Sequence, residues 1–179
     1  MPIIALLNRV RDSRNHPHPF IDREAAMCNS YLVGLAMQAY ADGHLDQGEK
    51  NLFMELARAL GLSQEAADAI LEEGRNATEE TVLRIRDNLV DSRFKYYFIL
   101  DLQIMAHQDN CLHPNEKLVL ERFRELLEID DEDTVFLVQL ANAVMEDDPE
   151  ARERWASDFF NDQQPEKLEA DDFAHYIQD

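Results

Sequence analysis

The sequence predicts an all-α protein, a helical bundle of about seven to nine helices built on a duplicated helix–acidic loop–helix unit. Three observations support this prediction. The 179 residues are 45% hydrophobic and include only five glycines and six prolines, so residues that favour helices dominate the chain. Apolar residues recur at intervals of three and four, which is the spacing of one buried helix face. The chain also repeats itself at an offset of 67 residues.

The N-terminal arm, residues 1–21, is predicted to contain one short helix. Residues 3–13 are amphipathic, and the prolines within 16–20 end the helix, because proline lacks a backbone donor and disfavours helical conformation in the preceding residue. We expect surface positions for the histidines that no motif uses, namely His16, His18, His44 and His175.

The first repeat is predicted to contain two helices separated by a short polar loop, and a third helix follows it. A long helix begins at Asp22 and ends at the turn at 42–43. The next helix begins at Asp46 and stops at Gly61, a residue that commonly ends helices. Ser63 then caps the third helix.

The remaining helices are predicted from similar start signals. A fourth helix opens at Thr78, and a fifth opens near Ser92. After the second loop and the helix that follows it, another helix begins at Asp130 or Asp131, and a further one begins at Pro149.

The two copies of the repeat match best around their polar loops. Aligning Asp42 with Asp109 at the offset of 67 places identical residues opposite each other, including Leu45 with Leu112, Glu49 with Glu116, Lys50 with Lys117 and Leu60 with Leu127. Each copy is therefore predicted to be an apolar helix, a loop that begins with Asp, and a helix that opens with a Glu-Lys pair.

The loop sequences ADGHLDQGEK (41–50) and QDNCLHPNEK (108–117) resemble the signature of the tellurite-resistance TerB family. The resemblance covers roughly residues 25–145. It implies an all-helical, non-catalytic module linked to tellurite resistance or general stress response, with metal binding at the acidic loops. We therefore divide the chain into the arm, a duplicated TerB-like domain (22–146), and an acidic, aromatic C-terminal helical extension (147–179).

The resemblance implies metal-ligand candidates in both loops. They are Asp42, Asp46 and Glu49 in the first loop and Asp109 and Glu116 in the second, and His113, a departure from the family pattern, adds a nitrogen ligand candidate. The ion expected is calcium, magnesium or a transition metal. The second loop departs from the first, because His113 stands where the first loop has Asp46, so the two sites need not bind the same ion.

Helix capping is the competing interpretation of these residues. Asp46 and Glu49 have the spacing of a capping box, and Asp42 precedes a glycine as in an ordinary turn, so for the first loop we favour capping over ion binding. His113 is a poor N-cap type, so capping explains the second loop less well. His107 and Cys111 add possible transition-metal ligands there, although a solvated loop is the more favoured interpretation.

Composition and charge exclude several function classes. A formal net charge of −20 disfavours nucleic-acid binding. Two cysteines, the lack of a signal-peptide pattern and the lack of a long apolar run predict a cytoplasmic protein without direct membrane insertion. No Ser-His-Asp set, glycine-rich phosphate loop or CxxC motif is present, so we expect no enzyme, and a hydrolytic metalloenzyme is the least favoured hypothesis.

Two functional hypotheses remain. The first is a TerB-like stress-response module that binds a divalent cation at both acidic loops and recruits protein partners. The second is a metal-independent helical adaptor that binds a basic protein surface through its acidic face and aromatic tail. The tail aromatics are Trp155, Phe159, Phe160, Phe173 and Tyr176, and we favour their docking on the core of the same chain over binding a partner.

Overall fold

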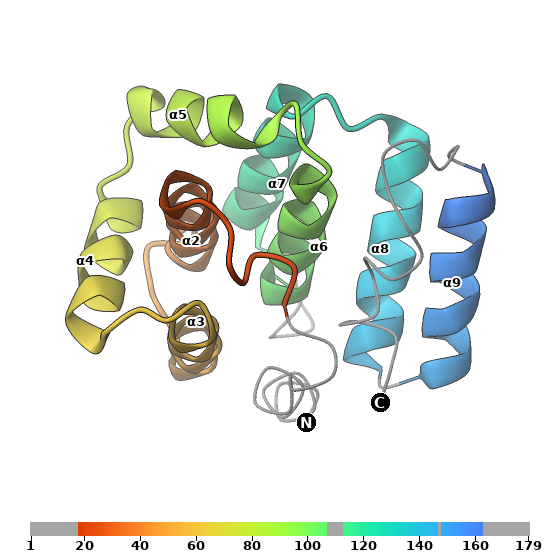
Figure 1. Ribbon diagram of the computed structural model, residues 1–179, viewed down its shortest axis with the longest axis horizontal. Helices are drawn as coiled ribbons and strands as arrows, with labels where there is room; N and C mark the ends of the chain where they lie inside the picture. The colour runs from red at the N-terminus through yellow and green to blue at the C-terminus, as the bar shows by residue number, and fades with distance from the viewer. Residues whose placement is uncertain (1–17, 107–112, 147, 163–179) are drawn as a thin grey trace.

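The computed structural model describes residues 18–106, 113–146 and 148–162. Within these residues it contains eight α-helices and no strand, which confirms the predicted all-α fold (Figure 1). The helices are α2 (Ala25–Ala39), α3 (Gln47–Ala59), α4 (Gln64–Arg75), α5 (Glu79–Leu89), α6 (Phe94–Ala106), α7 (Pro114–Leu126), α8 (Asp131–Met145) and α9 (Pro149–Asp162).

Side-chain caps fix the start of four helices where the sequence predicted them. Asp46, Ser63, Thr78 and Asp130 each accept a hydrogen bond from the backbone N–H three residues later, at the starts of α3, α4, α5 and α8. These amides have no partner within their own helix, so a polar side chain just before the helix stabilises that start. The predicted start of the last helix at Pro149 is also confirmed.

One predicted helix start was wrong. The first long helix begins at Ala25 rather than Asp22, because Asp22 adopts a left-handed conformation with φ 61° that no helix residue can share. The predicted start near Ser92 is confirmed to within two residues, since α6 begins at Phe94, but the Ser92 hydroxyl donates to the carbonyl of Leu89, the last residue of α5, at 2.9 Å instead of capping α6.

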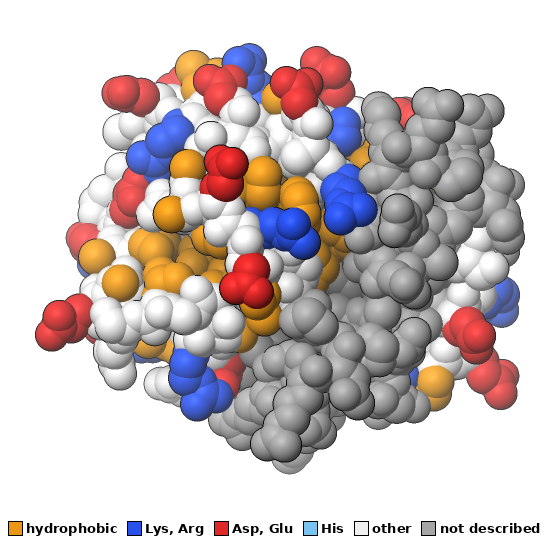
Figure 2. All heavy atoms as spheres, viewed as in Figure 1, with side chains coloured by type: hydrophobic (Ala, Val, Ile, Leu, Met, Phe, Trp, Pro, Cys, Tyr) orange, Lys and Arg blue, Asp and Glu red, His pale blue; other side chains and the backbone are white. Residues whose placement is uncertain are grey.

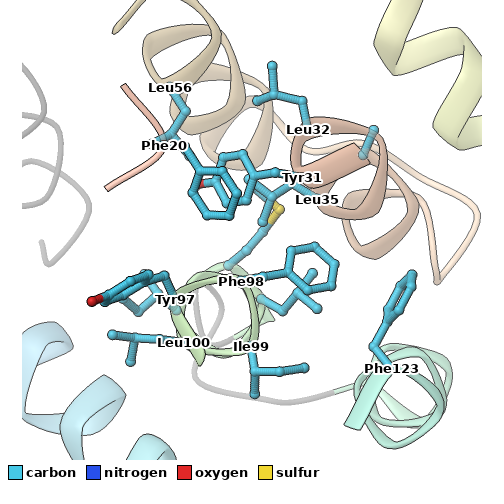
Figure 3. Close-up of a cluster of buried hydrophobic side chains, with 14 of the residues drawn as sticks. Phe20, Tyr31, Leu32, Leu35, Leu56, Tyr97, Phe98, Ile99, Leu100 and Phe123 are labelled. Atoms are coloured by element: carbon cyan, nitrogen blue, oxygen red, sulfur yellow. The ribbon is translucent and has the colours of Figure 1, made fainter. Parts of the chain in front are cut away.

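The core forms where α2 crosses α6 (Figure 3). Helix α2 also packs against α3, α4, α5 and α7, and every residue of α6 is buried. Helices such as α2 and α6 are apolar on all sides because neighbouring helices surround them. Phe98 lies at the crossing, with its ring 5.1 Å from that of Phe123 on α7 and edge-on to it. Gly34 is required opposite Phe98, since a Cβ at this position would lie 2.4 Å from the ring.

The contacts at this crossing follow the sequence repeat. Tyr31 and Phe98 are equivalent at the offset of 67 residues, and so are Gly34 and Asp101. The hydroxyl of Tyr31 donates to Asp101, and Phe98 packs closely on Gly34. Both contacts join the same two repeat positions, once from the first copy to the second and once from the second copy to the first. The two copies therefore make equivalent contacts with each other at the helix crossing.

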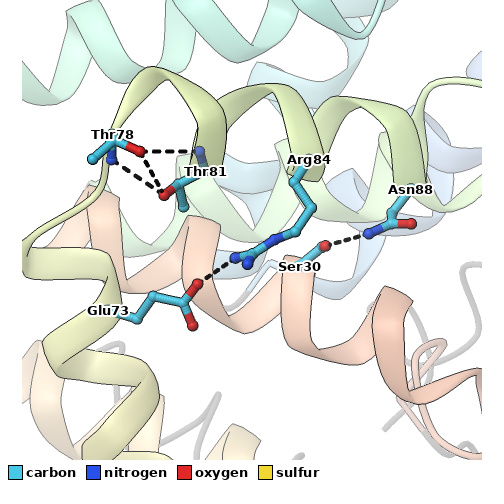
Figure 4. A network of polar contacts seen from close by, with 6 residues as sticks. All are labelled: Ser30, Glu73, Thr78, Thr81, Arg84 and Asn88. Atoms are coloured by element: carbon cyan, nitrogen blue, oxygen red, sulfur yellow. Dashed lines mark hydrogen bonds and ion pairs between the residues drawn. The ribbon is translucent and has the colours of Figure 1, made fainter.

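Polar contacts attach α5 to the other helices (Figure 4). The side-chain amide of Asn88 on α5 donates to the buried hydroxyl of Ser30 on α2 at 2.8 Å. Arg84 on α5 forms an ion pair with Glu73 on α4. These links hold α5 across one end of α2 and α4.

Helices α8 and α9 form an antiparallel pair at one end of the bundle (Figure 1). Trp155 on α9 is half-buried and packs edge-on against Phe136 on α8, with ring centroids 6.2 Å apart. This contact agrees with the expected docking of the tail aromatics on the core. The side chains of Phe159 and Phe160, and the residues 163–179, lie outside the described part of the chain.

Candidate functional site

The first acidic loop forms a capping box at the start of α3. Asp46 Oδ1 accepts a hydrogen bond from the backbone N–H of Glu49 at 2.8 Å, and Glu49 Oε2 accepts one from the backbone N–H of Asp46 at 3.0 Å. The capping interpretation of these two residues is confirmed. Each carboxylate uses one of its two oxygens for the cap.

Asp42 closes the turn before this capping box. Its Oδ1 accepts a hydrogen bond from the backbone N–H of His44 at 2.7 Å, and Gly43 adopts φ 92°, which glycine tolerates without strain. Asp42 and His44 are both exposed, as expected for a turn and for a surface histidine.

The second loop also ends in a capping box, contrary to the expectation that His113 fits this role poorly. Its Nδ1 accepts a hydrogen bond from the backbone N–H of Asn115 at 3.3 Å, and Glu116 Oε2 accepts one from the backbone N–H of His113 at 2.7 Å. An imidazole can cap in this way only while Nδ1 is unprotonated, so the neutral ring has its proton on Nε2. Neither ring nitrogen then offers a free lone pair to a metal.

Glu49 and Glu116 are the buried acidic residues of the two loops. Both side chains are buried, and they occupy equivalent positions of the two repeats. Burial raises the pKa of Glu49 to about 7; the backbone hydrogen bond from Asp46 opposes the rise, and the negative charges of Asp46, Glu116 and Asp42 add to it. The charge of Glu116 therefore acts on Glu49, although burial is the largest cause of the raised pKa of Glu49.

The described candidate ligands of the two loops, Asp42, Asp46, Glu49, His113 and Glu116, do not converge on one point. Among the described residues, no group of three or more His, Cys, Asp or Glu side chains is placed to hold a metal ion. Asp109 of the second loop, with His107 and Cys111, lies outside the described residues. Each repeat nevertheless contributes one buried carboxylate, Glu49 or Glu116.

A buried polar cluster at the helix crossing was missed by sequence reasoning. His18, expected at the surface, is only 2% exposed. Its Nδ1 accepts from the backbone N–H of Phe20 at 3.3 Å, so its Nε2 donates to Asp101 at 3.2 Å, and Tyr31 donates to the same carboxylate at 2.9 Å. The available signal was Asp101 itself, a lone carboxylate within the apolar run 94–106, which needs buried donors.

Charged side chains of both signs lie on the described part of the molecular surface. On the side shown in Figure 2, acidic and basic side chains of the described residues are interspersed around exposed apolar ones. None of the described helices is both long and apolar enough to cross a membrane.

Comparison with known proteins gives one match. The family model described as "Tellurite resistance protein TerB" matches residues 31–139, a span that includes both acidic loops and the helix crossing. No curated protein and no solved structure matches the chain.

Proposed function

This chain belongs to the TerB family, and we propose that it is a non-catalytic stress-response module of the cytoplasm that binds a divalent cation between its two acidic loops and recruits protein partners. The proposal refines the expectation of one ion at each loop. A single shared ion suits two repeats that each contribute one buried glutamate, because the charge of Glu116 acts on Glu49.

The observation that supports this proposal is the cost of a negative charge on Glu49, which is caused chiefly by burial and increased by the charges of Asp46, Glu116 and Asp42. A buried carboxylate of this kind gains stability when a cation or a proton neutralises it. Glu49 uses Oε2 for its helix cap, which leaves Oε1 available as a ligand without breaking the cap. Ion binding and capping are therefore compatible at this residue.

The ligand chemistry favours a hard cation over a transition metal. Carboxylate oxygens are the ligands that calcium and magnesium prefer, and both ions readily complete their coordination with water or backbone carbonyls. The imidazole of His113, the nitrogen ligand that a transition metal would favour, is engaged in the cap of α7. We therefore expect calcium or magnesium at this site.

Thermal unfolding of chelator-treated protein, titrated separately with calcium, magnesium, manganese, zinc and nickel, tests the proposal. An ion that binds only the folded state must raise the melting temperature in a saturable way. The test variant is Glu49→Gln/Glu116→Gln, because glutamine still caps a helix at this position but has no charge. Glu65→Gln, which neutralises an exposed glutamate in the first turn of α4, is the matched control.

The expected result is a rise in melting temperature that the double variant loses and the control retains. If neither calcium nor magnesium raises the melting temperature, the proposed ion is wrong. If the rise in melting temperature survives in the double variant, the proposed ligands are wrong.

The alternative is the metal-independent adaptor, and one observation favours it. The carboxylates of both loops already satisfy backbone amides at helix starts without any ion. If no cation stabilises the protein, these residues are helix caps and the function depends on protein partners alone.

A further inference from the structure

A groove between α6, α7 and α8 lies outside the acidic loops. It has a volume of about 490 Å³. Its apolar lining comes from Ile99 on α6, Leu120 on α7, and Val135 and Val138 on α8. Val135 is 57% exposed, an unusual position for an apolar side chain that lies beside other apolar groups.

Basic side chains stand beside this apolar surface. Lys117 and Arg124 of α7 line the groove together with the acidic Glu121 and Asp131, so basic residues are as frequent there as acidic ones, although the whole chain has only 17 basic residues against 37 acidic ones. Lys117 lies 3.7 Å from Glu121 and Arg124 pairs with Asp131, and the carboxylates of both pairs are exposed to solvent, so neither pair is a strong interaction. An occupant with an apolar face and acidic flanks would match this groove.

The C-terminal sequence has this composition. Within residues 168–177, Phe173, Tyr176 and Ile177 have the spacing of one helix face, and acidic residues precede them in the sequence. The acidic residues of this stretch are Glu169, Asp171 and Asp172.

The chain leaves the described structure close to the groove. Because α8 and α9 are antiparallel, α9 ends at Asp162 near the first turn of α8, where Asp131 and Val135 line the groove (Figure 1). The five residues 163–167 can span up to about 17 Å when extended. This reach is enough to pass from the end of α9 to the neighbouring side of α8, since packed helices lie roughly 8–10 Å apart.

We propose that residues 168–177 dock as an amphipathic helix in the α6–α7–α8 groove of the same chain. Phe173, Tyr176 and Ile177 contact the apolar lining, and the acidic residues of the segment lie toward Lys117 and Arg124. The docked segment covers Val135. This use of the groove is independent of the cation proposed at the acidic loops.

Paramagnetic relaxation in the full-length chain tests the docking. A spin label is attached at Ala174→Cys in a Cys28→Ser/Cys111→Ser background, and the methyl signals of Val138 and Leu120 are observed. These signals should broaden strongly, whereas the methyl signals of Ile70 on α4, at the opposite end of the bundle, should not (Figure 1). Broadening at any other surface, or at none, would overturn the proposal.

Two further samples separate the groove and its occupant. Val135→Glu places a charge in the groove at an exposed position, so it should abolish the broadening, while Val135→Leu should retain it. Persistence of the broadening in Val135→Glu would overturn the assignment to this groove. The second sample mixes isotope-labelled chains that have no spin label with spin-labelled chains of natural isotope abundance. No broadening is expected in this mixture, and strong broadening would assign the groove to the tail of a second copy instead.

Discussion

Replacing Glu49 by glutamine should make the protein more stable at alkaline pH and remove part of its pH dependence. The ordinary pKa of this carboxyl is 4.5, and in the folded protein burial raises it to about 7. Between these values the folded protein keeps a proton that the unfolded chain has lost, so wild-type stability falls as the pH rises through this window. The neutral amide of the Glu49→Gln variant has no such proton to lose.

The size of the effect follows from the shift in pKa. At 1.36 kcal/mol for each pKa unit, the rise from 4.5 to about 7 sets a ceiling of about 3 kcal/mol. We expect Glu49→Gln to gain about 1–3 kcal/mol at pH 8 and to match wild-type near pH 5. For a chain of this size that gain raises Tm by roughly 3–10 °C.

The assay is urea unfolding of wild-type and Glu49→Gln between pH 5 and pH 8.5, with chelator present so that no cation masks the effect. The exposed Glu65→Gln serves as the control and should follow wild-type at every pH. Parallel profiles for wild-type and Glu49→Gln, or a variant that is less stable at pH 8, would refute the view that a charge on Glu49 destabilises the fold.

Three further substitutions test the core and the second cap by denaturant unfolding. Gly34→Ala should destabilise the fold by about 1–3 kcal/mol, because its Cβ meets the Phe98 ring at 2.4 Å, and Phe98→Leu should partly rescue it; an unchanged midpoint would contradict the close packing. Tyr31→Phe should cost about 1–3 kcal/mol, since it removes a donor from the buried Asp101 carboxylate, and a neutral result would mean that this carboxylate needs no such donor. His113→Ala should cost about 0.5–2 kcal/mol and His113→Asp should retain the cap, whereas equal loss in both would argue against capping.

The helix starts could be predicted from sequence because their signals are local. A polar cap such as Ser63 or Thr78 acts on an amide three residues away, so the sequence alone contains both partners. The repeat likewise predicted which residues of the two copies are equivalent. Asp22 was misjudged because its left-handed conformation interrupts a stretch whose composition favours a helix.

The site could be predicted only in part because its second partner is distant in sequence. The capping box of Asp46 and Glu49 is local, but the action of the Glu116 charge on Glu49 depends on how the two repeats pack. His113 was judged by the average preference of its residue type, whereas one ring nitrogen in the correct tautomer suffices for a cap. His18 was placed at the surface because its partners, Tyr31 and Asp101, are far along the chain.

The central claim is that one cation is shared between the two repeats, and calorimetric titration of chelator-treated protein with calcium and magnesium tests it most directly. One ion should bind per chain, and binding should be lost in Glu49→Gln alone and in Glu116→Gln alone, because each repeat contributes one essential carboxylate. Two ions per chain, or binding that survives either substitution, would contradict the shared site.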